Sequence, residues 1–206
     1  MLQLFHTYID RQYKTPSGLI GYVIGEKMVK QHQPETHWTI SLLDLNRQDT
    51  VLELGCGAGY ALNKILKTEQ VQHVTGVDLS PVVLKLANRR NHREIQSGRA
   101  ELVHSSVDSL PLENESFHKI FSIHSLYFWE DLQAAVKEMH RLLVPGGMTI
   151  LTISNGKDGE AWPSIEELIE GQLIPVMTKT GFHHIEMLMG PDSRGYHTVA
   201  IAGKKK

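Results

Sequence analysis

The sequence predicts an α/β protein built on a doubly wound, mostly parallel sheet of seven strands that ends in an antiparallel hairpin. From residue 50 onward, short β-rich runs alternate with helix-like segments, which is the pattern of a parallel sheet with helices on both faces. The last two strand-like runs are separated only by GPDSRG. Such a short connection cannot hold a crossover helix, so these two strands must pair antiparallel.

The predicted strands are short runs rich in β-branched and other apolar residues. They are residues 50–55, 72–78, 100–104, 118–124, 148–154, 183–189 and 196–203. Helices are expected between them, at 59–68, from 80 onward, at 130–143 and at about 164–180. Ser80 is a good N-cap with Pro81 in the first helical position, and Pro145-Gly146-Gly147 ends the helix of residues 130–143.

The first 48 residues form a separate block with two expected helices, at about 18–31 and 35–45. We therefore expect an N-terminal helical cap at 1–48 and a second part at 49–206, together forming one structural unit. Several aromatic residues in the block are expected to lie over the crevice of the sheet or to cover its edge.

Composition excludes several classes of protein. A formal net charge of -2 over 206 residues is not the basic excess of a nucleic-acid binder, and the terminal Lys204, Lys205 and Lys206 are expected to be a solvated tail. The single cysteine, Cys56, excludes an internal disulfide framework and a Cys-rich zinc site. No run approaches the roughly 20 apolar residues of a membrane span, and the N-terminus does not resemble a secretory signal. A cytoplasmic location is expected.

Three glycines follow the first predicted strand, in the stretch VLELGCGAGY. Gly55, Gly57 and Gly59 sit where that strand ends and a helix begins, and ligands of open α/β sheets bind at such places. The dinucleotide fingerprint needs glycine or alanine where Tyr60 stands, and no lysine follows to complete a phosphate-binding P-loop. A nicotinamide-dependent oxidoreductase is therefore disfavoured.

With Glu53 in front of the glycines, the chain resembles the class I S-adenosylmethionine-dependent methyltransferases, whose fold is Rossmann-like. ELGCGAG (53–59) is similar to their first motif and GVDLS (76–80) to their second. The segment 105–129 resembles the acidic loop after strand three and the strand that follows, and RLLVPGG (141–147) resembles the approach to strand five. The resemblance covers residues 48–203, is closest to small bacterial members of the type-11 kind, and includes the terminal hairpin.

This resemblance implies S-adenosyl-L-methionine as cofactor and S-adenosyl-L-homocysteine as product. Asp78 would accept both ribose hydroxyls, and Asp108 would accept the adenine amine; a turn role is the alternative for each. Glu53, a carboxylate that is expensive to bury alone, would meet the ammonium group of the methionine arm. The implied cofactor-binding set is Glu53, Gly55, Cys56, Gly57, Gly59, Asp78, Leu79, Ser106, Val107, Asp108 and Ile123.

The expected reaction is methyl transfer to a small-molecule acceptor by in-line displacement, catalysed mainly by positioning. His124 is the candidate general base, with cofactor or backbone hydrogen bonding as the alternative role. Tyr127 is expected either to touch the acceptor or to pack. A non-catalytic module that binds the cofactor or its product is the alternative function. The acceptor, the methylated atom (O, N, C or S) and the oligomeric state stay open.

Neither a nucleic acid, nor a membrane, nor a metal ion is expected as partner. The residues after the fourth strand, His124-Ser125-Leu126-Tyr127, lack the Asn/Asp-Pro-Pro-aromatic pattern of nucleic-acid amine methyltransferases. Twelve histidines are present, but His183 and His184 point to opposite faces of a strand, and no H-E-x-x-H motif occurs.

Overall fold

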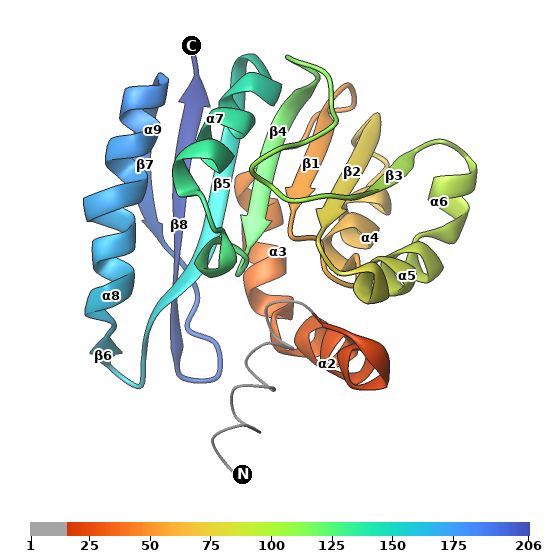
Figure 1. The fold of residues 1–206 in the computed structure, drawn as a ribbon, viewed down its shortest axis with the longest axis horizontal. Helices are drawn as coiled ribbons and strands as arrows, with labels where there is room; N and C mark the ends of the chain where they lie inside the picture. The colour runs from red at the N-terminus through yellow and green to blue at the C-terminus, as the bar shows by residue number, and fades with distance from the viewer. Residues whose placement is uncertain (1–15) are drawn as a thin grey trace.

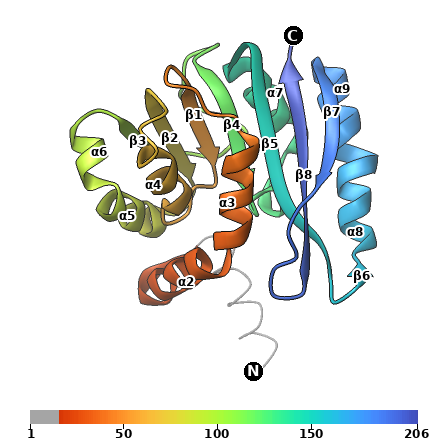
Figure 2. The same ribbon diagram turned by 180° about the vertical axis from the view of Figure 1, so that it is seen from behind.

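A central sheet with helices on both faces forms the fold, as seen in the computed structural model, which describes residues 16–206 (Figures 1 and 2). The strand order is β3-β2-β1-β4-β5-β8-β7, and a short strand β6 pairs with β5. The bounds are β1 (Thr50–Leu54), β2 (His73–Asp78), β3 (Ala100–His104), β4 (Phe117–Ile123), β5 (Leu143–Lys157), β6 (Glu160–Ala161), β7 (Phe182–Met189) and β8 (Tyr196–Lys205). The seven predicted strands are confirmed, and β6 is an addition.

The direction of the strands explains where a ligand can bind. All neighbours from β3 to β5 run parallel, whereas β8 is antiparallel to both β5 and β7. The predicted hairpin is therefore confirmed, with the last strand of the chain inserted between its neighbours. Chain order reverses between β1 and β4, which leaves a crevice at their carboxyl ends. The arrowheads of β1, β2 and β4 point toward helix α2 (Gly18–Gln31) in Figure 1.

Helices bury two apolar clusters, one on each face of the sheet. On one face lie α3 (Gln33–Leu42), α4 (Tyr60–Leu66) and α5 (Pro81–Arg90), with Leu62, Leu84 and Phe121 in the cluster. On the other face lie α7 (Leu132–Leu142) and the segment before β7. The short helices α6 (His92–Gln96) and η1 (Leu126–Phe128, 3-10) occur in connections.

The predicted helix at 164–180 is divided into three parts by its own sequence. They are α8 (Pro163–Glu166), a π-helical segment η2 (Glu167–Leu173) and α9 (Ile174–Thr180). Pro175 has no N–H to donate to the preceding turn, which disrupts the regular α-helical ladder at this point. Ile169, Leu173 and Met177 still recur every four residues and stay buried, so the apolar face is continuous.

Helices α2 and α3 contact elements on both sides of the crevice. In α3, the buried Thr39 hydroxyl lies 2.7 Å from the Thr152 hydroxyl of β5. In α2, Glu26 forms an ion pair with Arg90 of α5 at 2.7 Å. Residues 1–15 of the predicted cap lie outside the described residues. Among residues 16–206, we find no helix with the length and apolar character that a bilayer span requires.

The expectation of a solvated C-terminal lysine tail is wrong for Lys205. This residue ends β8 and is only 8% exposed. Its Nζ donates to the Leu143 carbonyl at 2.8 Å and to Glu115 Oε1 at 3.0 Å. Because β8 runs between two other strands, its last residues are carried into the interior along with it.

Candidate functional site

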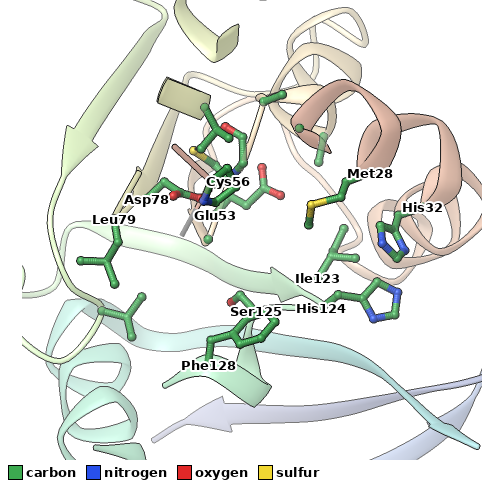
Figure 3. Close-up of a pocket in the computed structure, with 18 of the residues that line it drawn as sticks. Met28, His32, Glu53, Cys56, Asp78, Leu79, Ile123, His124, Ser125 and Phe128 are labelled. Carbon is green, nitrogen blue, oxygen red and sulfur yellow. Dashed lines mark hydrogen bonds between the residues drawn. The ribbon is translucent and has the colours of Figure 1, made fainter. Parts of the chain in front are cut away.

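A pocket of about 470 Å³ lies at the carboxyl ends of β1, β2 and β4, next to α2 (Figure 3). This volume is typical of small-molecule sites. The pocket is lined by every residue of the predicted cofactor set except Gly59: Glu53, Gly55, Cys56, Gly57, Asp78, Leu79, Ser106, Val107, Asp108 and Ile123. Leu79 is 45% exposed, so it offers the pocket an apolar surface that a ligand could cover.

Two carboxyl groups lie close together at one end of the pocket. Glu53 on β1 is 4% exposed, and its Oε2 is buried with no hydrogen-bond partner among the described residues. Burial, followed by the nearby Asp78 carboxylate, raises the pKa of Glu53 well above its ordinary value. Burial also raises the pKa of Asp78, although backbone N–H groups oppose the shift. Such a pair suits a ligand that brings a cation and hydroxyl groups.

Asp78 also organises the loops around it. Its Oδ2 accepts from the Gly57 N–H at 2.9 Å, and its Oδ1 accepts from the Ser80 N–H at 2.8 Å. Each carboxylate oxygen has a second lone pair, so both oxygens can still accept a hydroxyl from a ligand. The turn role considered from the sequence and the ligand role are therefore compatible at this residue.

The glycines of the first loop have different surroundings. Gly57 has a φ of 51°, and a Cβ placed on it would meet nothing within 4 Å, so its backbone faces open pocket. A Cβ on Gly59 would lie 2.8 Å from the Ala87 Cβ and 2.7 Å from Asn91 Nδ2. Gly59 thus permits close packing of the loop on α5, which explains why it does not line the pocket. Burial raises the pKa of the Cys56 thiol, which favours the neutral form.

His124 follows β4 in an unusual backbone conformation, with a φ of 54°. Its imidazole lines the pocket, and its Nε2 is buried without a hydrogen-bond partner in the described part of the chain. Burial, and then the nearby His32, lowers the pKa of His124 to about 3. The ring is therefore neutral near pH 7 and is a hydrogen-bond acceptor, but a weaker base than an ordinary histidine.

The Tyr127 hydroxyl is directed at the backbone. It donates to the Ser154 carbonyl at 2.9 Å, and its ring stacks on that of His124 with centroids 6.3 Å apart. Burial raises the pKa of Tyr127, so the phenol stays protonated. Tyr127 is not among the residues that line the pocket. Of the two expected roles of Tyr127, its contacts are those of a packing residue.

Several polar residues near the pocket were missed by the sequence analysis. Glu35 of α3 is fully buried, and its Oε1 accepts from Arg194 Nη2 at 3.3 Å. Burial lowers the pKa of His32 to about 4 against an opposing effect of Glu35. Ser125 donates to the Leu54 carbonyl and accepts from Trp129 Nε1, at 3.0 and 3.1 Å. The one available signal was the nearness of His32 and Glu35 in the sequence, at the junction of α2 and α3.

The chain was compared with known proteins and solved structures. Residues 52–151 match the family described as "Methyltransferase domain". The chain is 30% identical over 165 residues to the uncharacterized methyltransferase YdaC of Bacillus subtilis, covering 80% of this chain and 88% of that one. It is 27% identical over 174 residues to a demethylmenaquinone methyltransferase of Listeria welshimeri, covering 83% of this chain and 70% of the relative.

A solved structure shows the same fold. It is the putative methyltransferase in a complex with the Haloferax volcanii Trm112 methyltransferase activator, with a TM-score of 0.73 at 19% identity. The match covers 89% of this chain and 93% of that chain. Fold and relatives together define a class I S-adenosylmethionine-dependent methyltransferase. The chain belongs to the methyltransferase domain family.

Proposed function

We propose that this protein binds S-adenosylmethionine in the pocket between β1, β2, β4 and α2 and transfers its methyl group to a small-molecule acceptor. The observation that carries the proposal is the arrangement of Glu53, Gly57 and Asp78 around one pocket at the crevice of the sheet. When bound, the cofactor supplies an electrophilic methyl group on a sulfonium. In the proposed transfer, the carbon–sulfur bond would break with its electron pair left on sulfur as the bond from the methyl carbon to the acceptor forms. The proton of the acceptor's hydroxyl or N–H group would leave to solvent.

The acidic residues have separate roles in this proposal. Asp78 accepts the ribose hydroxyls with its remaining lone pairs, and Asp108 accepts the adenine amine. Glu53 pairs with the ammonium group, whose arrival would stabilise a buried carboxylate that has an unpartnered oxygen. Leu79, Val107 and Ile123 supply apolar surface for the base, and Gly57 lets the methionine arm approach the backbone.

The acceptor is proposed to occupy the end of the pocket formed by Met28, His32, Thr36, His124 and Phe128. This end combines apolar side chains with imidazoles that burial keeps neutral. We therefore favour an uncharged, partly apolar acceptor with a hydroxyl or N–H group that donates to His124. A quinone-related acceptor of this kind is consistent with the name of the Listeria relative. Catalysis then rests mainly on alignment, since a weakly basic His124 can orient a donor but removes a proton poorly.

Calorimetric titration with S-adenosylhomocysteine tests the cofactor site. Gly57→Ala should bind at least tenfold more weakly than wild type, because its methyl group would enter the space given to the ligand, a loss of about 1.4 kcal/mol or more. Gly98→Ala is the matched control, since Gly98 also has a positive φ (75°) and open space around it, but does not line the pocket. Equal affinity in the two variants would reject the placement of the methionine arm.

Turnover requires a separate measurement. Methyl-labelled S-adenosylmethionine, incubated with the protein and the small-molecule fraction of a cell extract, should yield label in an extractable product. Cofactor binding without any labelled product would identify a binding module instead of an enzyme.

A further inference from the structure

Three side chains with metal-ligating atoms gather where α3 begins and β4 ends. One ligand atom from each of His32, Glu35 and His124 lies within 4.8 Å of the other two. The rings of the two histidines have centroids 4.3 Å apart, and Figure 3 shows them side by side at one end of the pocket. Among residues 16–206, this is the one group of three such side chains with this proximity.

Two atoms in this group are buried without hydrogen-bond partners from the described residues. They are Glu35 Oε2 and His124 Nε2, and Glu35 itself is 0% exposed. A buried polar atom without a partner is costly, and native structures usually satisfy it with protein, water or an ion. One bound ion could satisfy both of these atoms.

We propose that His32, Glu35 and His124 bind a divalent transition-metal ion of the Zn²⁺, Fe²⁺ or Mn²⁺ class. Two imidazoles and one carboxylate match the donor preferences of these ions, whereas Mg²⁺ and Ca²⁺ prefer oxygen ligands alone. Bonds to such a metal measure about 2.0–2.2 Å, so two of its ligand atoms can be at most about 4.4 Å apart. The ligand atoms here lie within 4.8 Å of one another, so the widest pair would have to approach when the ion binds.

The surrounding residues fix the orientation of the three ligands. His32 is the N-cap residue of α3 and Glu35 lies in its first turn, so the junction of α2 and α3 places both side chains. His124 is held by its left-handed backbone and by the stacked Tyr127 ring. Glu35 keeps Oε2 free because Arg194 occupies Oε1. In known metal sites, groups that contact a ligand without binding the metal themselves orient that ligand in this way.

Charge and access define what else such an ion would bind. Arg194 Nη2 lies 3.3 Å from Glu35 Oε1 and 3.5 Å from His32 Nδ1, so its positive charge opposes that of the ion, and an anionic oxygen such as hydroxide as a further ligand would offset this repulsion. His32 and His124 line the pocket, so open coordination positions would face the acceptor end. With an ion bound, His124 would ligate the metal, and the acceptor would face the open coordination positions instead of donating to His124. The site goes beyond the proposed methyl transfer and can be tested without cofactor or acceptor.

The test is a metal titration of the untagged full chain after treatment with a chelator. Zn²⁺ binding is measured by calorimetry, and Co²⁺ binding by its visible absorption, which reports nitrogen and oxygen ligands. Wild type should bind one ion per chain. His32→Ala and His124→Ala should each weaken binding by about tenfold or more. Loss of a group that only orients a ligand already lowers metal affinity by that much, and loss of a ligand should lower it at least equally.

His184→Ala is the matched control, because His184 is exposed and its ring lies 4.7 Å from that of His183, forming a second histidine pair. The expectation that these two histidines point to opposite faces is wrong, since His184 has a left-handed backbone (φ 49°) where the register of β7 shifts. The control variant should bind as wild type does. Circular dichroism confirms that each variant is folded. The absence of stoichiometric binding in wild type, unchanged binding in both His32→Ala and His124→Ala, or loss of binding in His184→Ala would each overturn the proposal.

Discussion

At the scale of single residues, Glu53 lowers the stability of the folded protein because its carboxyl group is buried beside a second acid. It is a carboxyl group within the hydrophobic strand β1, with one oxygen unpartnered in the described residues and another acid nearby. Its pKa in the folded chain is well above the value of 4.5 expected when unfolded. The folded state therefore binds the proton more tightly than the unfolded state does. As pH rises above 4.5, the folded protein loses stability relative to the unfolded chain.

Glu53→Gln should remove this pH dependence while keeping the size of the side chain. We expect the variant to be more stable than wild type at pH 8 by about 1–3 kcal/mol, with a smaller difference at pH 4.5. Thermal unfolding of the cofactor-free protein across this range measures the effect.

The same variant should bind S-adenosylhomocysteine at least about tenfold more weakly, because a charge-assisted bond to the ammonium group is lost. Glu101→Gln, at an exposed position on β3, is the control and should change neither property. A gain in stability without a loss of affinity would show that Glu53 does not bind the cofactor.

At the scale of elements, an ion pair between Glu26 of α2 and Arg90 of α5 holds α2 next to the pocket. Arg90 donates to both carboxylate oxygens of Glu26, at 2.7 and 2.8 Å, and also to the Ala58 carbonyl in the first loop. One guanidinium thus connects α2, α5 and the glycine loop. The arrangement couples the cover of the pocket to the loop that is proposed to hold the methionine arm.

Arg90→Ala should loosen α2 without unfolding the sheet. We expect faster amide hydrogen exchange in residues 18–31, and a loss of about 1 kcal/mol in the free energy of unfolding, since the pair is partly solvated. Hydrogen-exchange mass spectrometry measures the first effect. Arg89→Ala, at the adjacent exposed position, is the control. The same exchange rates in the two variants would show that the ion pair does not hold α2.

At the scale of the whole molecule, the last strand of the chain lies inside the sheet, next to its edge strand. β8 separates β5 from β7, so the sheet reaches its full width only after the last residues are in place. The buried Lys205 joins this strand to Leu143 and Glu115. A residue near the terminus thus has the contacts of an interior residue.

Lys205→Ala should lower the free energy of unfolding by about 1–3 kcal/mol, because the buried Leu143 carbonyl loses a charged donor. Lys206→Ala, one residue further and exposed, should have no measurable effect. Denaturant unfolding of both variants makes the comparison. Equal stabilities would mean that Lys205 contributes no more than its solvated neighbour.

The sequence by itself determined the strands, the hairpin and the position of the ligand crevice. These features depend on local properties: apolar runs, a connection too short for a crossover helix, and glycines directly after β1. Asp78 was found for the same reason, since it ends β2. The sequence could not indicate that Gly59 packs on α5, or that the Tyr127 hydroxyl donates to Ser154.

Only the tertiary structure decided which distant side chains meet. Arg194 is 159 residues from Glu35 in the chain, yet the two form a partly buried contact beside His32 and His124. His32 and Glu35 are near in the chain, but nothing local links either of them to the residue after β4. Their meeting depends on how α3 packs against the sheet and where the β7–β8 hairpin turns. Burial and the choice of hydrogen-bond partners are properties of that packing. They determine the shifted pKa values in the pocket, and they also leave unpartnered the buried atoms on which the metal proposal rests.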